Sequence, residues 1–173
     1  MEKELNIPDG VDVTIEGKKV KVSGPKGEVE RVFKHFFEIK IERRGDKIVV
    51  SSPSERRKVK AMVGTIAAHI RNMMIGVTKG FTYRMRIVYS HFPVTVKVEG
   101  RKLFIHNFLG EKTPRIAKIV GQTNVEIRGR DIILTGINKE DVGLTSSNIE
   151  QACRITKYDR RIFMDGIYRV SRE

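Results

Sequence analysis

Basic and aromatic residues are interleaved in one short segment near the end of the chain, QACRITKYDRRIFMDGIYRV, at residues 151–170. The basic residues are Arg154, Lys157, Arg160, Arg161 and Arg169, and the aromatic residues are Tyr158, Phe163 and Tyr168. Arginine makes forked contacts with phosphate oxygens, lysine supplies a point charge, and tyrosine supplies a hydroxyl group or a stacking face. The segment is therefore either a solvated basic face or a surface that holds a polyanionic phosphate backbone.

Helix electrostatics explain part of this pattern. If a helix ends near Lys157 and Arg160, its macrodipole stabilises each of these cations by about 0.3–1 kcal/mol. That stabilisation gives no reason for the other cations or for the aromatic residues between them. We therefore interpret the segment as a contact with RNA.

A second candidate contact is the loop NFLGEKTPR at residues 107–115, in which Phe108 and Leu109 precede Lys112 and Arg115. An exposed apolar pair brings no benefit to a protein that acts alone. Two interpretations stay open: the pair packs onto a neighbouring sheet, or it forms a tip that inserts against RNA or another protein.

The sequence predicts no catalytic residue, metal site or cofactor. Its histidines, His35, His69, His91 and His106, lack the paired spacing of metal ligands, and His69 is interpreted as a packed or capping residue. Cys153 is the only cysteine, so no disulfide can form within the chain, and we expect it to be a small buried residue. GPKG at residues 24–27 has the G-x-x-G spacing of the KH module, but it links two strand patterns where that module joins two helices.

The charge balance indicates a negatively charged partner. The 173 residues include 34 Lys+Arg and 21 Asp+Glu, a formal net charge of +13, and nucleic acid is the partner that such a charge favours first. An anionic membrane is the alternative. However, no stretch approaches the roughly 20 apolar residues of a spanning helix, and MEKELNIPDG lacks an apolar signal core. We therefore expect a cytoplasmic protein.

The chain contains an internal repeat, and this repeat defines the elements that must position the basic segment. VTIEGKKVKVSGPKGE at 13–28 aligns without a gap with VKVEGRKLFIHNFLGE at 96–111. Each copy opens with a hairpin that turns at Glu-Gly-Lys or Glu-Gly-Arg, and each is followed by a second hairpin, turning at Gly45-Asp46 or Gly129-Arg130. We predict two tandem domains, 1–91 and 92–173, joined by a short stiff linker at residues 90–93.

One helix follows the second hairpin in each half. From Ser54, a plausible N-cap, the stripe Val59, Val63, Ile66, Ile70 and Met73 has helical spacing. In the second half Asn138 can cap a helix, whose firm part is placed at 145–157 because Gly143 and Ser146-Ser147 are weak helix formers. Each half is expected to end on an aromatic-rich strand, KGFTYRMRIVYSHF or DGIYRV, the latter turned by Asp165-Gly166 so that Tyr168 and Arg169 return alongside the sheet. The predicted fold class is α+β, with an antiparallel sheet packed against one α-helix in each domain.

Several of these stretches together closely resemble one known family. The doubled unit, the PKGE loop, TKGFTYRMRIVYSHFP, HNFLGEK and NIEQACRITKYDRRIFMDGIY are similar to large-subunit ribosomal protein L6, in its archaeal and eukaryotic branch. The resemblance covers nearly the whole chain. It implies a non-enzymatic, structural constituent of the large ribosomal subunit that acts in translation in the cytoplasm, without a cofactor.

The resemblance also implies partners and contact residues. It implies binding to large-subunit rRNA near the sarcin-ricin loop, close to where translation GTPases dock, beside neighbouring ribosomal proteins, with the C-terminal domain carrying much of the rRNA contact. Carried over by position, the contact falls on Arg154, Lys157, Tyr158, Arg160 and Arg161, and on Lys112 and Arg115. Arg169, from the same basic segment, completes the predicted rRNA-binding residues.

Two alternatives from other classes remain open on the sequence. One is an RNA-modifying enzyme, which a bound metal or nucleotide would favour. The other is a protein-interaction adaptor that docks through Phe108, Leu109 and the edge strands, with its charge serving solubility alone.

Overall fold

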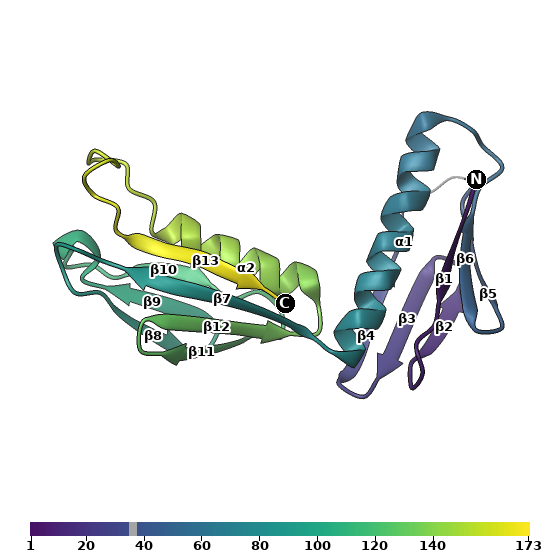
Figure 1. Cartoon of the computed structure of the whole chain (residues 1–173), viewed down its shortest axis with the longest axis horizontal. Helices are drawn as coiled ribbons and strands as arrows, with labels where there is room; N and C mark the ends of the chain where they lie inside the picture. Colours follow the sequence, from purple (N-terminus) through teal and green to yellow (C-terminus); the bar gives the residue numbers. More distant parts are fainter. Residues whose placement is uncertain (35–37) are drawn as a thin grey trace. The chain divides into compact units, whose positions relative to one another are not determined.

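The chain forms two compact units, Met1–Gly80 and Phe81–Glu173, in a computed structural model that describes residues 1–34 and 38–173 (Figure 1). His35 lies outside the described residues. Each unit has its own cluster of buried apolar side chains, so each has its own core.

In its described residues, the first unit has six strands followed by one helix. Its elements are β1 (Glu2–Asn6), β2 (Asp12–Glu16), β3 (Lys19–Gly24), β4 (Gly27–Val32), β5 (Lys40–Arg44), β6 (Lys47–Ser51) and α1 (Arg57–Thr78). The strands form two antiparallel sheets, in the orders β1-β6-β5 and β2-β3-β4. The predicted helical stripe is confirmed, since Val63, Ile66, Ile70 and Met73 are buried and Val59 is half-buried.

The second unit repeats this order and adds a strand after its helix (Figure 1). Its elements are β7 (Phe81–Val88), β8 (Thr95–Glu99), β9 (Lys102–His106), the 3-10 turn η1 (Phe108–Gly110), β10 (Arg115–Lys118), β11 (Asn124–Arg128), β12 (Asp131–Gly136), α2 (Lys139–Ala152) and β13 (Gly166–Arg172). Its antiparallel sheets have the orders β10-β9-β8 and β11-β12-β7-β13. The prediction of two α+β units with antiparallel strands and one helix each is confirmed, and the strands of each unit divide between two sheets.

The glycine turns of the two hairpins recur at equivalent places in both units. Gly17 and Gly100 turn the first hairpin of each unit with φ values of 61° and 59°, and Gly45 and Gly129 turn the second with 60° and 61°. A side chain is strained in this left-handed conformation, so glycine is required there. The predicted hairpins are confirmed at all four places.

The boundary between the units differs from the prediction. β7 pairs with β12 and β13 of the second unit, so the units divide at Gly80 and Phe81 and not between residues 91 and 92. β7 is the counterpart of β1, because each is the first strand of its unit and pairs with the last strand before the helix. FTYRMRIV, at residues 81–88, therefore begins the second unit and does not end the first. The predicted linker at residues 90–93 lies inside the second unit, between β7 and β8.

Both helices begin at places that their local hydrogen bonds explain. The hydroxyl groups of Ser52 and Ser54 accept hydrogen bonds from the N–H groups of Ser54 and Arg56. These bonds hold the stretch in turns, and α1 begins at Arg57 without a side-chain cap. Ser54 is therefore not the N-cap that the sequence predicted.

The start of α2 is set by Asn138, as predicted. The Asn138 side chain accepts a hydrogen bond from Glu140 N–H at 3.1 Å, and the acidic residues of the first turn favour the helix N-terminus. The helix nevertheless runs over 139–152 and not 145–157. Packing offsets the weak propensity of its early turns, because Thr145 and Ser146 are fully buried. The hydroxyl group of Thr145 donates to Asp141 C=O and accepts from Val120 N–H.

Candidate nucleic-acid interface

Most of the basic segment is a loop, and its central cations do not lie at the end of a helix. The chain leaves α2 at Ala152 and returns as β13 at Gly166, and the stretch between them, residues 153–165, is here called the closing loop. Lys157 and Arg160 lie well beyond the last helical residue. The helix macrodipole, which fades within one turn, therefore does not explain these two cations.

The closing loop is held from its own backbone. Ile155 is buried, and its carbonyl oxygen accepts a hydrogen bond from Arg160 Nε at 3.1 Å. The Asp159 carbonyl oxygen accepts from the N–H groups of Ile162 and Phe163, and the Asp159 carboxylate accepts from Arg161 N–H. These bonds close a tight turn that carries Arg160 and Arg161 at its tip.

Aromatic and polar contacts fix the base of the closing loop. The Phe163 ring stacks on His91 with centroids 4.5 Å apart and lies tilted against Tyr158 at 4.7 Å. Asp165 is 1% exposed, and its Oδ1 accepts hydrogen bonds from the Ser90 N–H and hydroxyl groups. The loop is thereby tied to the end of β7.

β13 returns alongside the sheet, as the sequence predicted. Tyr168 pairs with Arg86 and Arg169 with Met85 in the β13–β7 ladder. The Tyr168 hydroxyl donates to Met164 C=O at 3.0 Å, and a Cβ atom at Gly166 would meet the Tyr168 ring at 3.0 Å. A side chain at position 166 would therefore crowd this ring, which would have to shift.

The cations of the closing loop are accessible. Arg154, Lys157 and Arg160 are exposed, and Arg161 is exposed over 89% of its side chain although it forms an ion pair with Asp159 at 3.0 Å. Among residues 1–34 and 38–173, no acceptor engages the side chains of Arg154 and Lys157. Arg161 lowers the pKa of the Asp159 carboxyl group by hydrogen bonding. The loop therefore presents cations that are not sealed in internal carboxylate pairs.

Arg169 and Arg115 differ from these accessible cations. Arg169 is half-buried on β13, and its guanidinium carbon lies 5.8 Å from the centre of the Tyr83 ring. Arg115 donates to both carboxylate oxygens of Glu111 and to the carbonyl oxygens of Ala152 and Arg154. Because its donors point inward, Arg115 positions the start of the closing loop, and phosphate contact is better assigned to its neighbours.

The loop at residues 107–115 resolves the alternative that the sequence left open. Phe108 and Leu109 are 1% and 8% exposed and belong to the core of the second unit, so they do not form an external tip. The guanidinium of Arg115 lies over the Phe108 ring at 4.6 Å. Lys112 is exposed, and no acceptor holds its side chain in the described part of the chain. An adaptor that docks through Phe108 and Leu109 has no surface to use.

Sequence reasoning missed two exposed apolar residues and a pocket in the same region. Ile162 and Met164 are 65% and 64% exposed, beside the accessible cations. A pocket of about 560 Å³ opens against the loop. It is lined by Glu150, Gln151, Cys153, Arg154, Ile155, Arg160, Phe163, Met164, Asp165 and Tyr168. One signal in the sequence could have indicated this region. Basic and apolar residues are mixed there without the spacing of a helix or of a strand, so neither kind of element explains the apolar residues.

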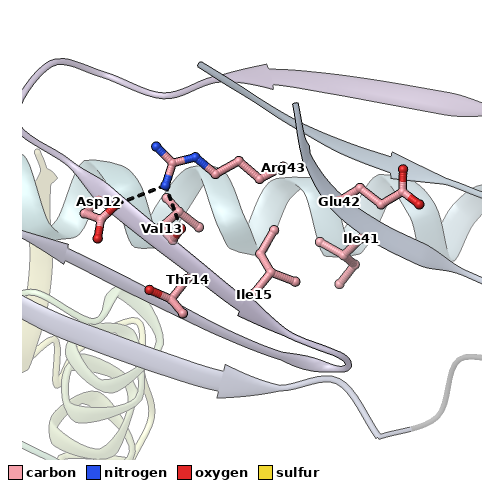
Figure 2. A pocket seen from close by; sticks show the side chains of 7 residues that line it. All are labelled: Asp12, Val13, Thr14, Ile15, Ile41, Glu42 and Arg43. Atoms are coloured by element: carbon pink, nitrogen blue, oxygen red, sulfur yellow. Dashed lines mark hydrogen bonds and ion pairs between the residues drawn. The ribbon is translucent and has the colours of Figure 1, made fainter. Parts of the chain in front are cut away.

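The first unit also has a pocket, but its arginine is engaged. Figure 2 shows this pocket of about 640 Å³ between β2 and β5, lined by Asp12, Val13, Thr14, Ile15, Ile41, Glu42 and Arg43. Arg43 reaches across and donates to the Asp12 carboxylate and to Val13 C=O. A guanidinium held by these acceptors ties the two sheets together.

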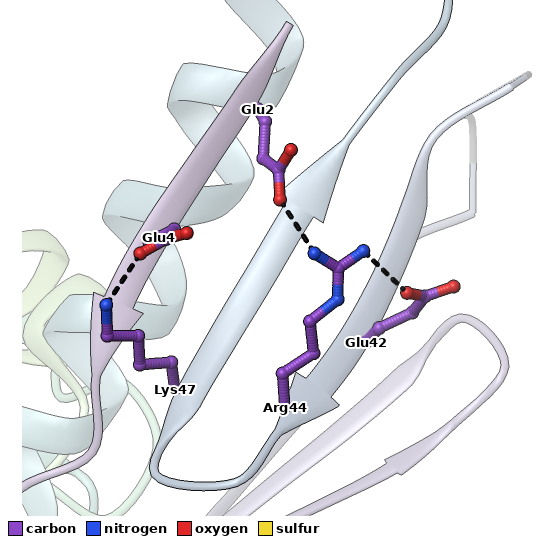
Figure 3. A network of polar contacts seen from close by, with 5 residues as sticks. All are labelled: Glu2, Glu4, Glu42, Arg44 and Lys47. Carbon is purple, nitrogen blue, oxygen red and sulfur yellow. Dashed lines mark hydrogen bonds and ion pairs between the residues drawn. The ribbon is translucent and has the colours of Figure 1, made fainter.

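The exposed face of the sheet β1-β6-β5 is neutralised in the same way. Arg44 on β5 bridges Glu2 of β1 and Glu42, and Lys47 pairs with Glu4 at 2.8 Å (Figure 3). Lys47 lowers the pKa of the Glu4 carboxyl group by hydrogen bonding. These paired cations are less suited to an external polyanion than those of the closing loop.

The GPKG turn and His69 have structural roles. Lys26 N–H donates to the Val77 carbonyl near the end of α1, and Lys26 Nζ donates to Lys79 C=O. The turn joins β3 to β4, so it links strands as the sequence indicated. His69 lies near the Phe33 ring, in keeping with a packed residue. The described residues include no group of three potential metal ligands and no helix long and apolar enough to cross a membrane.

Comparison with known proteins decides the family. The model of the family described as Ribosomal protein L6 matches residues 7–80 and 92–166. The chain belongs to the ribosomal protein L6 family. The second matched segment, 92–166, includes the repeat at 96–111, and β7 lies between the two matched segments.

Curated relatives of this family are similar over nearly the whole chain. The large ribosomal subunit protein uL6 of Ignicoccus hospitalis is 53% identical over 173 residues, which cover 98% of this chain and 93% of that protein. The proteins of the same name from Methanosarcina mazei and Methanothrix thermoacetophila are 53% and 54% identical over 170 residues, with 98% of this chain and 96% of each relative covered. These matches confirm the predicted family and its similarity to archaeal members. They also confirm the prediction of a ribosomal protein and not an enzyme.

Proposed function

We propose that this protein is a structural constituent of the large ribosomal subunit that binds large-subunit rRNA through the closing loop and β13. The family supports the ribosomal role. The accessible cations at Arg154, Lys157, Arg160 and Arg161, held on a loop with internal anchors, support the location of the contact. Lys112, Tyr158 and Arg169 extend it on the same unit, which is the main rRNA-binding domain in this proposal.

In this proposal the protein positions rRNA through its phosphate groups and does not recognise a base sequence through these contacts. Arg160 and Asp159 hold the turn through its own backbone carbonyls, so the backbone that carries the cations loses little conformational freedom when they meet phosphate oxygens. Contacts to phosphates fix register and orientation, and they release counterions, so binding depends steeply on salt concentration. The bound rRNA lies near the sarcin-ricin loop, beside neighbouring ribosomal proteins and close to where translation GTPases dock.

Replacement of Arg160 and Arg161 by alanine tests the contact. We expect the double variant to keep the fold of both units, although the closing loop loses the hydrogen bond from Arg160 to Ile155 C=O, and to bind large-subunit rRNA more weakly. The plot of log association constant against log salt concentration should flatten by about 1.5, since each phosphate neutralised on a single strand or a duplex contributes roughly 0.7–0.9 to this slope. Filter binding at several salt concentrations measures both quantities.

A control variant separates a local contact from net charge. Arg101→Ala with Arg128→Ala removes the same charge from exposed positions of the second unit, and Arg128 is already paired with Glu126. We expect this control to retain most of the affinity and the slope. Equal losses in both double variants would show that the closing loop has no special part in binding. Protection of rRNA remote from the sarcin-ricin loop in a hydroxyl-radical footprint would contradict the proposed location.

A further inference from the structure

We propose that the pocket against the closing loop holds an unstacked guanine base of the bound rRNA, whose edge donates to the Asp165 carboxylate. This inference rests on the proposed function, because it names what the same site recognises. The pocket, of about 560 Å³, lies within the range of roughly 300–1,000 Å³ that small-ligand sites occupy, and it has room for a base with its sugar.

Asp165 supplies the observation that asks for a ligand. It lines the pocket and is 1% exposed, yet its Oδ2 atom has no hydrogen-bond partner among the described residues. Burying a carboxylate oxygen without a hydrogen-bond donor costs folding free energy. The other oxygen of this carboxylate, Oδ1, already accepts a hydrogen bond from Ser90. A donor brought by a ligand would remove this cost. Met164, an exposed side chain of the same wall, can give way to admit it.

The charge of the wall favours a base over a phosphate group. Arg154 and Arg160 line the pocket together with two carboxylates, those of Glu150 and Asp165. A phosphate would be repelled by these carboxylates, whereas the edge of a base carries N–H donors that pair with them. The accessible cations then meet the phosphates on either side of the base.

The remaining wall suits an aromatic ring. Ile155, Phe163 and Met164 supply apolar surface, and Tyr168 supplies a half-exposed ring. The planes of Arg154 and Arg160 offer further stacking faces, which are a common way of holding unstacked bases of RNA. Guanine fits best, because its Watson–Crick edge places imino and amino donors side by side, and both can donate to the one free oxygen, Asp165 Oδ2.

Chemical probing of large-subunit rRNA in complex with the full chain tests this assignment. Kethoxal modifies the same edge of guanine, and dimethyl sulfate and a carbodiimide report on the other bases. We expect the wild-type chain to protect one guanine from kethoxal inside its hydroxyl-radical footprint. Asp165→Asn should restore the reactivity of that guanine, keep the surrounding backbone footprint, and weaken binding roughly tenfold.

A second pair of variants keeps the test valid if Asp165→Asn folds poorly. Met164→Glu places a negative charge on the exposed wall of the pocket, and Ile162→Glu places the same charge two residues away on a side chain that does not line it. We expect Met164→Glu to restore kethoxal reactivity and Ile162→Glu to leave the guanine protected. Equal behaviour of the two variants would overturn the proposal.

The outcomes separate this inference from the proposed function. A backbone footprint without any protected guanine overturns the pocket assignment and leaves rRNA binding in place, as would be seen if the pocket takes a segment of a neighbouring protein. Protection of adenine, cytosine or uracil alone also overturns it. The lack of a footprint on large-subunit rRNA would contradict the proposed function itself.

Discussion

At the scale of single residues, Arg115 shows how a cation of a basic protein can be used internally. Its guanidinium is shared between the Glu111 carboxylate and two main-chain carbonyl groups, at donor–acceptor distances from 2.7 to 3.0 Å. Hydrogen bonding to Arg115 lowers the pKa of Glu111, and hydrogen bonding to Glu111 raises that of Arg115. The fork therefore links the loop at residues 107–115 to the end of α2.

Arg115→Lys should destabilise the second unit, because an ammonium group cannot reach four acceptors in this arrangement. We expect a loss of roughly 1–3 kcal/mol in the free energy of unfolding, measured with urea at neutral pH. The lowered pKa of Glu111 adds stability above its ordinary value of 4.5, and this part is lost as the pH falls through the folded value. The variant should lose less stability than the wild type on acidification below pH 4.5. An equal acid response would show that the pair makes no contribution.

Cys153 is the buried small residue that the sequence predicted. Burial raises the pKa of its thiol to about 12, so the thiolate that reacts with electrophiles is scarce at neutral pH. The residue lines the pocket as an apolar group and not as a nucleophile.

At the scale of elements, the cap of α2 decides where the helix begins. Asn138→Ala removes the acceptor for Glu140 N–H and should cost about 1 kcal/mol of stability, within the range of roughly 0.5–2 kcal/mol for such caps. Equilibrium denaturation measures this loss. Asn138→Ser retains a side-chain acceptor and should stay near the wild-type value. If both variants match the wild type, the packing of Val142 and Thr145 alone determines the start of the helix.

The hairpins, the first helix and the accessible cations could be predicted because each depends on local spacing. Gly17 and Gly100 lie at turns that require positive φ, and the stripe from Val63 to Met73 has one period throughout. The extent of α2 could not be predicted, since Thr145 is fixed by a bond from Val120, which is remote in sequence. The inward use of Arg115 also depends on partners that sequence spacing does not reveal.

At the scale of the whole molecule, two units with separate cores follow the same order of strands and helix. Their boundary could not be predicted from the alignment of the repeats, because β7 precedes the repeated segment and joins it by pairing with β12. Lysine and arginine outnumber aspartate and glutamate in both units, so net charge alone does not locate the rRNA contact.

Two fragments of the second unit should differ sharply in stability. Residues 81–173 contain β7 and are expected to fold alone, with cooperative thermal unfolding and dispersed amide resonances. Residues 92–173 lack the buried side chains of Phe81, Tyr83, Met85 and Ile87. At roughly 1.5–3 kcal/mol each, their loss consumes the 5–15 kcal/mol typical of a domain, so this fragment should be unfolded. Cooperative folding of residues 92–173 would contradict the boundary.

The first strands of the two units, β1 and β7, differ in whether they lie at the edge of their sheet. This difference affects the tendency of the chain to aggregate. β13 pairs with β7, whereas within the described residues no strand continues the sheet beyond β1. An open edge is a template for another copy of the chain, but Glu2, Lys3 and Glu4 place consecutive charges along it. These charges disfavour pairing of the open edge with a second copy of the chain.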